Sequence, residues 1–274
     1  MAVADLHLHT THSDGRLSVA ELIDRVAVSS ATLFSITDHD TTNGLDEAFQ
    51  YTEKYPDLRL IPGIELSADT SDDEIHVLGY FIDYHNRQFQ QHLTGFRDGR
   101  KTRAQMMIKN LCDLGMEITW ERVLQIAGDG TVGRPHIALA LVEAGYFEAP
   151  KDAFINHLNR QGLAYAEVPK LTPQDAVALI KSTGGVAVLA HPFEIKNMTR
   201  WIRILKNEGL DGLETFYGGY DVGTVNHLLR ISASYDLIAT GGSDFHGLGN
   251  SWEKAPGSVG PPVETVEQLE MLAK

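Results

Sequence analysis

The sequence predicts an α/β barrel, and three observations lead to that prediction. Seven short apolar segments have the length of buried strands, and helical segments separate most of them. Such alternation is typical of parallel strands joined by crossover helices. Polar, titratable residues stand at or near the ends of at least six of these strands, which is where an α/β barrel carries its chemistry.

The first part of the barrel is expected to contain four strands, at residues 3–9, 33–37, 60–65 and 75–81. Ser18 and Glu21 form a capping-box pattern for a helix that runs to about residue 29. A second helix is expected near residues 45–55. We expect Glu65 to close the third strand.

The pattern changes in the middle of the chain. From about residue 86 to residue 164, helical spacings dominate and strand signals are scarce. Pro135 suits the first turn of a helix in this region, and Gly145 suits its end. We interpret residues 86–164 as an inserted helical domain that binds substrate, and residues 1–85 with 165–274 as the barrel domain.

The strand-helix alternation resumes after this insertion. Thr172, followed by Pro173 and Asp175, is expected to begin a helix that ends at Gly184. Further strands are expected at residues 186–190, 212–214 and 237–240. The first of these leads to His191, and the last leads to Asp244 and His246.

Composition and net charge limit the classes of partner and substrate that this protein can bind. The 274 residues are 43% hydrophobic and 22% charged, as in a soluble globular enzyme. The net charge of −14 argues against binding to long duplex nucleic acid or to anionic membranes. It permits a phosphorylated substrate, because bound divalent metals would reverse the local field.

The sequence also indicates a location. The chain has one cysteine, Cys112, so it forms no intrachain disulfide and no site of several thiolates. No apolar run approaches the roughly 18 residues of a membrane span, and no basic-then-apolar segment opens the chain. We therefore expect a cytoplasmic protein.

The candidate metal ligands come from many separate loops. Residues two apart on a strand point to the same side, so His7 and His9 can bind one cation. Taken singly, His76 could be a core histidine and Glu65 a turn cap, but convergence on one barrel face favours a metal centre. The full set is His7, His9, Asp14, His39, Glu65, His76, His191, Asp244 and His246. His12 is the alternative to Asp14.

These motifs resemble, in order along the chain, a PHP (polymerase and histidinol phosphatase) domain. They are Asp5-Leu6-His7-Leu8-His9-Thr10 with Ser13-Asp14-Gly15, Thr37-Asp38-His39-Asp40, Gly63-Ile64-Glu65, His76-Val77-Leu78-Gly79-Tyr80, His191-Pro192 and Gly242-Ser243-Asp244-Phe245-His246. Residues 133–138 are similar to the inserted segment of the YciV/TrpH-like nucleotide phosphatases and ribonucleases. The resemblance implies a distorted seven-stranded barrel with a trinuclear metal centre.

The resemblance also implies how the ligands are shared among three divalent ions. One ion would take His7, His9, Glu65 and Asp244, a second would take Glu65, His76 and His191, and a third would take Asp14, His39 and His246. Glu65 can bridge because a carboxylate has two oxygens, whereas a histidine nitrogen offers one lone pair. Mixed imidazole and carboxylate ligands suit manganese, our first expectation, and also iron or zinc.

The activity implied is hydrolysis of a phosphate ester by a hydroxide that bridges two metals. Arg134 would hold the phosphate in a forked geometry, with His136 as a second contact. The alternative for this pair is a helix-start arginine beside a surface histidine. Substrates that fit are nucleoside 3′,5′-bisphosphates, AMP-like monoesters and the 5′ ends of short oligonucleotides.

Two other functions compete with this one. A metal-dependent amidohydrolase also uses a His-x-His pair, but such sites commonly hold two metals or fewer, and Asp14, Glu65 and His246 would be in excess. A non-catalytic module would retain the fold alone. The intact ligand set argues against it, because carboxylates and histidines clustered in one cavity are costly without cations.

Overall fold

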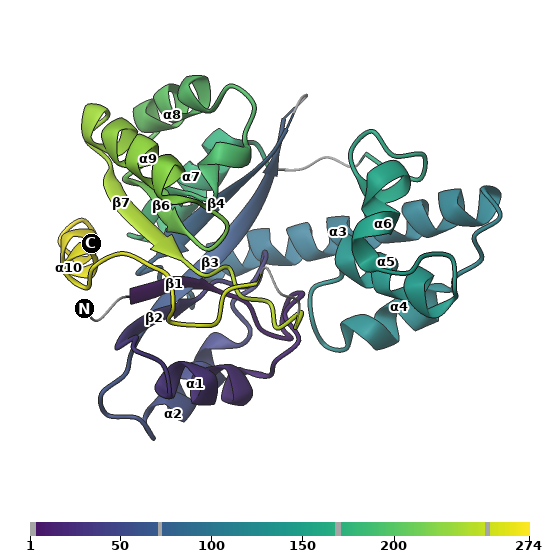
Figure 1. Cartoon of the computed structure of the whole chain (residues 1–274), viewed down its shortest axis with the longest axis horizontal. Helices are drawn as coiled ribbons and strands as arrows, with labels where there is room; N and C mark the ends of the chain where they lie inside the picture. The colour runs from purple at the N-terminus through teal and green to yellow at the C-terminus, as the bar shows by residue number, and fades with distance from the viewer. Residues whose placement is uncertain (1–3, 71–72, 168–170, 250–252) are drawn as a thin grey trace.

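The described residues form a sheet of seven strands whose spatial order follows the chain. The computed structural model describes residues 4–70, 73–167, 171–249 and 253–274, so Val3 of the first expected strand lies outside it. The strands are β1 (Ala4–Leu8), β2 (Leu33–Ile36), β3 (Arg59–Asp69), β4 (Glu74–Tyr80), β5 (Val186–Leu189), β6 (Gly212–Tyr217) and β7 (Ile238–Gly242). Leu8 bridges to Phe245, so the sheet curls into a nearly closed barrel, as expected (Figure 1).

The expectation that all strands are parallel is wrong at β4. The pairs among β1, β2 and β3 and among β5, β6 and β7 are parallel, but β4 is antiparallel to both β3 and β5. β3 continues past Glu65 to Asp69, and β4 begins at Glu74, so Glu65 lies inside its strand and does not close it. The short connection permits only a reversal, because a parallel neighbour needs a crossover of about a dozen residues.

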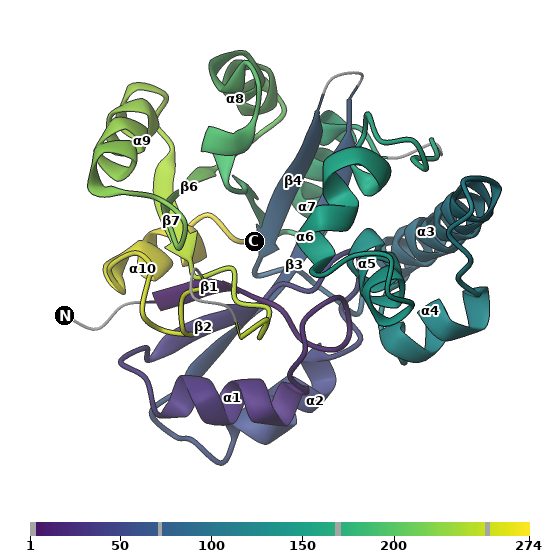
Figure 2. The ribbon, with the colours of Figure 1, turned by 45° about the vertical axis from the view of Figure 1, so that its right-hand side comes forward.

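The helices of the barrel pack on the outside of the sheet (Figure 2). They are α1 (Val19–Ala27), α2 (Leu45–Thr52), α7 (Pro173–Ser182), α8 (Met198–Asn207), α9 (Val222–Ser234) and α10 (Glu264–Glu270), with a 3₁₀ turn, η2 (Pro192–Glu194). The predicted capping box is present: Glu21 N–H donates to Ser18 Oγ at 3.3 Å, and Ser18 N–H donates to Glu21 Oε2 at 2.9 Å. Thr172 caps α7 by accepting a hydrogen bond from Asp175 N–H at 3.1 Å.

A second group of helices lies to one side of the barrel (Figures 1 and 2). These are α3 (Arg87–Asp113), α4 (Trp120–Ala127), α5 (Arg134–Glu143), α6 (Pro150–Ala153) and the π-helical turn η1 (Phe154–Leu158). They share a hydrophobic cluster of their own that includes Met107, Ile137 and Leu141. The first turns of α3 instead bury Phe89 and Leu93 in the barrel core, so α3 joins the two parts.

The start of α5 is held against the mouth of the barrel. Thr131 N–H donates to the carbonyl oxygen of His12 at 2.8 Å. As expected, Pro135 occupies the first turn of α5 and Gly145 follows its end with a φ of 81°. Among the described helices, none is long and apolar enough to cross a membrane.

Candidate metal centre

The two histidines of the first motif point into the barrel. His7 on β1 and His9 just after it are fully buried. Their Nε2 atoms face the same two carboxylates: His7 lies 3.2 Å from Glu65 Oε2 and 3.2 Å from Asp244 Oδ1, and His9 lies 3.3 and 3.1 Å from those atoms. The two-residue spacing along the strand therefore produces the shared direction that the sequence predicts.

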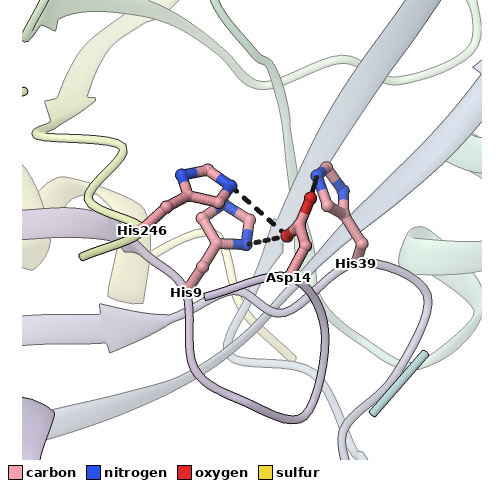
Figure 3. A group of neighbouring side chains, drawn as sticks. All are labelled: His9, Asp14, His39 and His246. Atoms are coloured by element: carbon pink, nitrogen blue, oxygen red, sulfur yellow. Dashed lines mark ion pairs between the residues drawn. The ribbon is translucent and has the colours of Figure 1, made fainter. Parts of the chain in front are cut away.

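A tight loop after β1 returns Asp14 to the same place. The Asp38 carboxylate holds this loop by accepting from Thr10 N–H, Thr10 Oγ1 and Ser13 Oγ at 2.8, 2.6 and 2.5 Å. A Cβ at Gly15 would lie 2.5 Å from the His9 carbonyl oxygen, so the loop requires glycine there. The loop places Asp14 3.3 Å from His246 and 3.9 Å from both His9 and His39. Figure 3 shows the three imidazoles arranged around the Asp14 carboxylate.

Glu65 is the centre of the arrangement, because one carboxylate faces five imidazole rings. Its Oε2 lies within 3.3 Å of His7, His9 and His39, and its Oε1 lies within 3.2 Å of His76 and His191. These rings come from β1, from the loop after β2, from β4 and from the segment after β5. Only the closed barrel brings them together.

The described residues contain three groups whose ligand atoms could hold a metal ion. Within each group the ligand atoms lie within 4.8 Å of one another: His9, Asp14, His39 and His246; His7, His9 and Glu65; His39, Glu65 and His76. The sharing differs from the one the resemblance implies, since His9 and His39 each belong to two groups. His12 is in none of them, and its Nε2 lies 3.9 Å from Glu47, so the geometry favours Asp14 over His12.

The geometry of the donor atoms suits metal coordination better than hydrogen bonding among the side chains. His9 Nε2, Asp14 Oδ1 and His39 Nδ1 are buried, and within the described structure none has a hydrogen-bond partner. Carboxylate oxygens or imidazole nitrogens lie 3.1–3.3 Å away in ion-pair range, but their directions do not form hydrogen bonds. Buried polar atoms are otherwise almost always paired, so these lone pairs face a common space where cations fit.

In the metal-free centre, protonated imidazoles balance the charge of ionised carboxylates. Burial opposes ionisation of Glu65, yet the imidazoles of His39, His7 and His76 hold its pKa well below the usual range. Burial also opposes protonation of His246, but Asp14 and Asp244 raise the pKa of that imidazole to about 10. At His39 burial dominates and lowers the pKa to about 3. The centre therefore mixes protonated and neutral imidazoles with ionised carboxylates.

Two functional residues were missed by reasoning from the sequence. Glu214 on β6 is fully buried; its Oε1 lies 2.8 Å from His7 Nδ1, and its Oε2 accepts from His191 N–H at 2.7 Å. Tyr217, at the end of β6, donates its hydroxyl to Asp244 Oδ2 at 2.8 Å. The signal that could have identified Glu214 is its place at the end of the strand predicted at residues 212–214.

Arg134 and His136 lie where α5 meets the barrel. Arg134 opens α5, and its Nη2 donates to Glu74 on β4. His136 is buried, with 5% of its surface exposed, and its Nδ1 accepts from Gly133 N–H at 3.0 Å. The alternative of a surface histidine is therefore wrong, although Arg134 does begin a helix.

A cavity of about 450 Å³ opens beside the centre. Its lining includes Asp14, Asp244 and His246 from the centre, Tyr217 and Lys254 from the barrel, and Pro135 from α5. A ligand in this cavity would touch the candidate metal ligands and the start of α5 together. Cavities of a few hundred Å³ are of the size that small-molecule substrates occupy.

Comparisons with known proteins agree with this geometry. The family model described as the PHP domain matches residues 5–149. The 5′-3′ exoribonuclease Rnm of Escherichia coli (strain K12) is 32% identical over 89% of this chain and 85% of that protein. The 3′,5′-nucleoside bisphosphate phosphatase of Chromobacterium violaceum is 29% identical over 100% of this chain and 95% of that protein.

A solved structure is similar over the whole chain. It is a protein of Bifidobacterium adolescentis described as a candidate metal-dependent phosphoesterase, and its TM-score is 0.89 at 32% identity. The similarity covers 100% of this chain and 97% of that one. Helices α3 to α6 are therefore included in the similarity, together with the barrel.

Proposed function

The chain belongs to the PHP domain family of metal-dependent phosphoesterases, and we propose that its substrates are nucleotides or the 5′ ends of short oligonucleotides. The observation that carries this proposal is the set of three ligand groups joined through Glu65, His9 and His39. Asp14 and His246 of one group line the cavity beside the centre. Relatives named for action on nucleotides and RNA support the substrate class.

Three divalent ions, with manganese first, are the cofactors we propose. The ligands would be the nine side chains of the sequence-based prediction: His7, His9, Asp14, His39, Glu65, His76, His191, Asp244 and His246. When bound, such ions would supply Lewis acidity, which activates water for attack on phosphorus and neutralises charge on the phosphate oxygens. The orphaned atoms of His9, Asp14 and His39 support this ligand set.

The protein's own residues position the ligands and the substrate. Glu214 orients the ring of His7 from behind, and the Tyr217 hydroxyl fixes one oxygen of Asp244. Burial, with the charge of Asp244, raises the pKa of Tyr217 well above its usual value, so its hydroxyl stays a donor. Arg134 and His136 bring phosphate contacts from residues 86–164, and no nucleophilic side chain is required.

The acidic surface limits the substrate to a small or end-bound one. With a net charge of −14 the chain has no long-range attraction for duplex nucleic acid. The cavity of about 450 Å³ suits one nucleotide rather than a continuous strand.

Release of free phosphate and release of mononucleotides are the two measurements that test the proposal. The purified chain with Mn²⁺ is assayed on a nucleoside 3′,5′-bisphosphate, on AMP and on 5′-phosphorylated oligonucleotides, and its metal content is measured by elemental analysis. We expect hydrolysis of at least one of these and close to three metals per chain. Inactivity on every phosphoester would overturn the proposal, and cleavage of amides with two metals or fewer would favour an amidohydrolase.

A further inference from the structure

Three arginines meet where the insertion covers the β3–β4 hairpin, and we call Arg100, Arg103 and Arg134 the arginine cluster. Arg100 and Arg103 are neighbours on α3, at a spacing of three residues. Arg134 opens α5, and Arg100 also reaches that helix start, because a Cβ at Gly133 would lie 3.5 Å from Arg100 Nη1. Three like charges are thus gathered in a partly buried place.

Two of the three charges are neutralised. Arg100 donates from Nε to Asp40 Oδ2 at 2.5 Å and from Nη2 to Ser67 Oγ at 2.6 Å. Arg134 is paired with Glu74. Each partner is an anion or a hydroxyl on or beside the β3–β4 hairpin, so both guanidiniums are held against the barrel.

The third guanidinium has a buried nitrogen that is left unmatched. Arg103 is 4% exposed, and within the described chain its Nη1 has no hydrogen-bond partner. Burial, together with the charges of Arg100 and Arg134, lowers its pKa to about 10, so the guanidinium remains protonated at neutral pH. The charge of Glu74 offsets part of this effect. A buried guanidinium N–H without a partner is still unfavourable, and an arginine does not relieve the cost by losing its proton. An anion at this position would remove the cost.

The residues that pair with the arginine cluster lie two positions from metal-centre residues along β3 and β4. Ser67 follows Glu65 by two residues on β3, and Glu74 precedes His76 by two residues on β4. Ser67 and His76 are directly paired across the two strands, so all four residues lie on one face. Two residues along a strand span about 7 Å, so the two places are separated by about that distance along the sheet.

We propose that Arg103, with Arg100 and Arg134, binds a second phosphate group of the substrate, one that is not hydrolysed. This inference rests on the proposed function and specifies it: the preferred substrate carries two phosphates, as a nucleoside bisphosphate or an oligonucleotide end does. Guanidinium groups suit the task because their N–H groups match phosphate oxygens in a forked geometry. Arg134 then contacts this second phosphate, and the metal centre is left to the reacting one.

A kinetic comparison tests the assignment. The values of kcat/KM are measured for a nucleoside 3′,5′-bisphosphate and for the corresponding 3′- and 5′-monophosphates, in the wild type and in Arg103→Met. We expect the variant to lose about tenfold to a hundredfold more on the bisphosphate than on the monophosphate that is hydrolysed, because a hydrogen bond to a charged group is removed. Equal losses on both substrates would overturn the assignment.

Arg122→Met is the matched control. Arg122 lies on α4 in the same insertion, is 48% exposed and pairs with Glu143. It therefore differs from Arg103 in both exposure and pairing. The ratio of the two kcat/KM values should match the wild type in this variant. A change as large as that of Arg103→Met would show that the ratio responds to general loss of positive charge, which also contradicts the proposal.

A second measurement does not depend on activity. The full chain is treated with EDTA, and its Tm is followed as inorganic phosphate is added. We expect phosphate to raise the Tm of the wild type and to have little effect on Arg103→Met, whose Tm without phosphate should equal or exceed that of the wild type. A lower Tm without phosphate and an intact phosphate response would make Arg103 a structural residue. This arm remains decisive if no phosphoesterase activity is found.

Discussion

The metal centre and the arginine cluster lie along the same face of β3 and β4, yet they manage buried charge in opposite ways. In the metal centre, carboxylates and imidazoles alternate, and protons on His191 and His246 balance ionised Glu65, Asp14 and Asp244. In the arginine cluster Arg100 and Arg134 pair with Asp40 and Glu74, but Arg103 has no described hydrogen-bond partner at Nη1. An imidazole can exchange its proton for a metal ion, whereas a guanidinium can only be matched by an anion.

A substitution of Glu65 in the metal centre should have the largest effect on activity. Glu65→Gln removes the charge that faces five imidazoles, and an amide oxygen and nitrogen cannot bridge two cations as a carboxylate does. We expect phosphoesterase activity to fall by about a thousandfold or more, since metals supply several kcal/mol of charge stabilisation. Initial rates and bound metal per chain measure the loss. Retention of full metal content and near-normal rates would contradict the central place of Glu65.

A substitution of Glu214, which contacts the metal ligand His7, should have an intermediate effect on metal affinity. Glu214→Gln keeps the shape of the side chain but weakens its hold on His7 Nδ1. Such outer partners of metal ligands typically contribute about tenfold to a hundredfold in metal affinity or activity. A titration of activity against Mn²⁺ concentration should therefore shift to higher metal. Thr240→Val, at another buried polar site on β7, serves as the control and should leave that titration in place.

The protons that balance the metal centre predict a pH dependence of stability. Without metals, the pKa of His191 is about 9 and that of His246 is about 10, both above the ordinary value for histidine. Stability from a raised histidine pKa is fully present below the unfolded value and is lost as pH rises through the folded value. The Tm of the EDTA-treated chain should therefore fall between about pH 7 and about pH 10.

Added Mn²⁺ should reduce that fall. Metal binding requires deprotonated imidazoles, so it strengthens as pH rises, while the proton-dependent ion pairs weaken. Thermal unfolding at several pH values, with EDTA or with Mn²⁺, separates the two curves. A Tm that is constant or rising over this range in EDTA would show that the imidazoles are not protonated in the metal-free chain.

The smallest effect is expected for an arginine that water already solvates. Arg122 and Glu143 form a two-pronged pair at 2.7 and 2.9 Å, but each is 48% exposed. Arg122→Met should leave the free energy of unfolding nearly unchanged, since exposed pairs are screened. Urea denaturation measures it. A large loss of stability would mean that burial is not what distinguishes Arg103 from Arg122.

Local patterns predicted much of the fold. The capping box at Ser18 and Glu21, the proline and glycine that bound α5, and the shared direction of His7 and His9 all depend on residues within a few positions of one another. The family and the α/β barrel followed from the order of such motifs. The error at β4 arose because an apolar strand has the same pattern in either direction, and only its short link to β3 decides.

By itself the sequence determined which side chains could bind metal, because strand periodicity and loop motifs are local properties. Only the tertiary structure decided their neighbours. Glu214 lies 207 residues from His7 along the chain, and the buried Nη1 of Arg103 is recognised as unmatched only once the helices are packed on the barrel. Contacts of this kind arise from closure of the barrel and docking of the insertion, and no spacing along the chain encodes them.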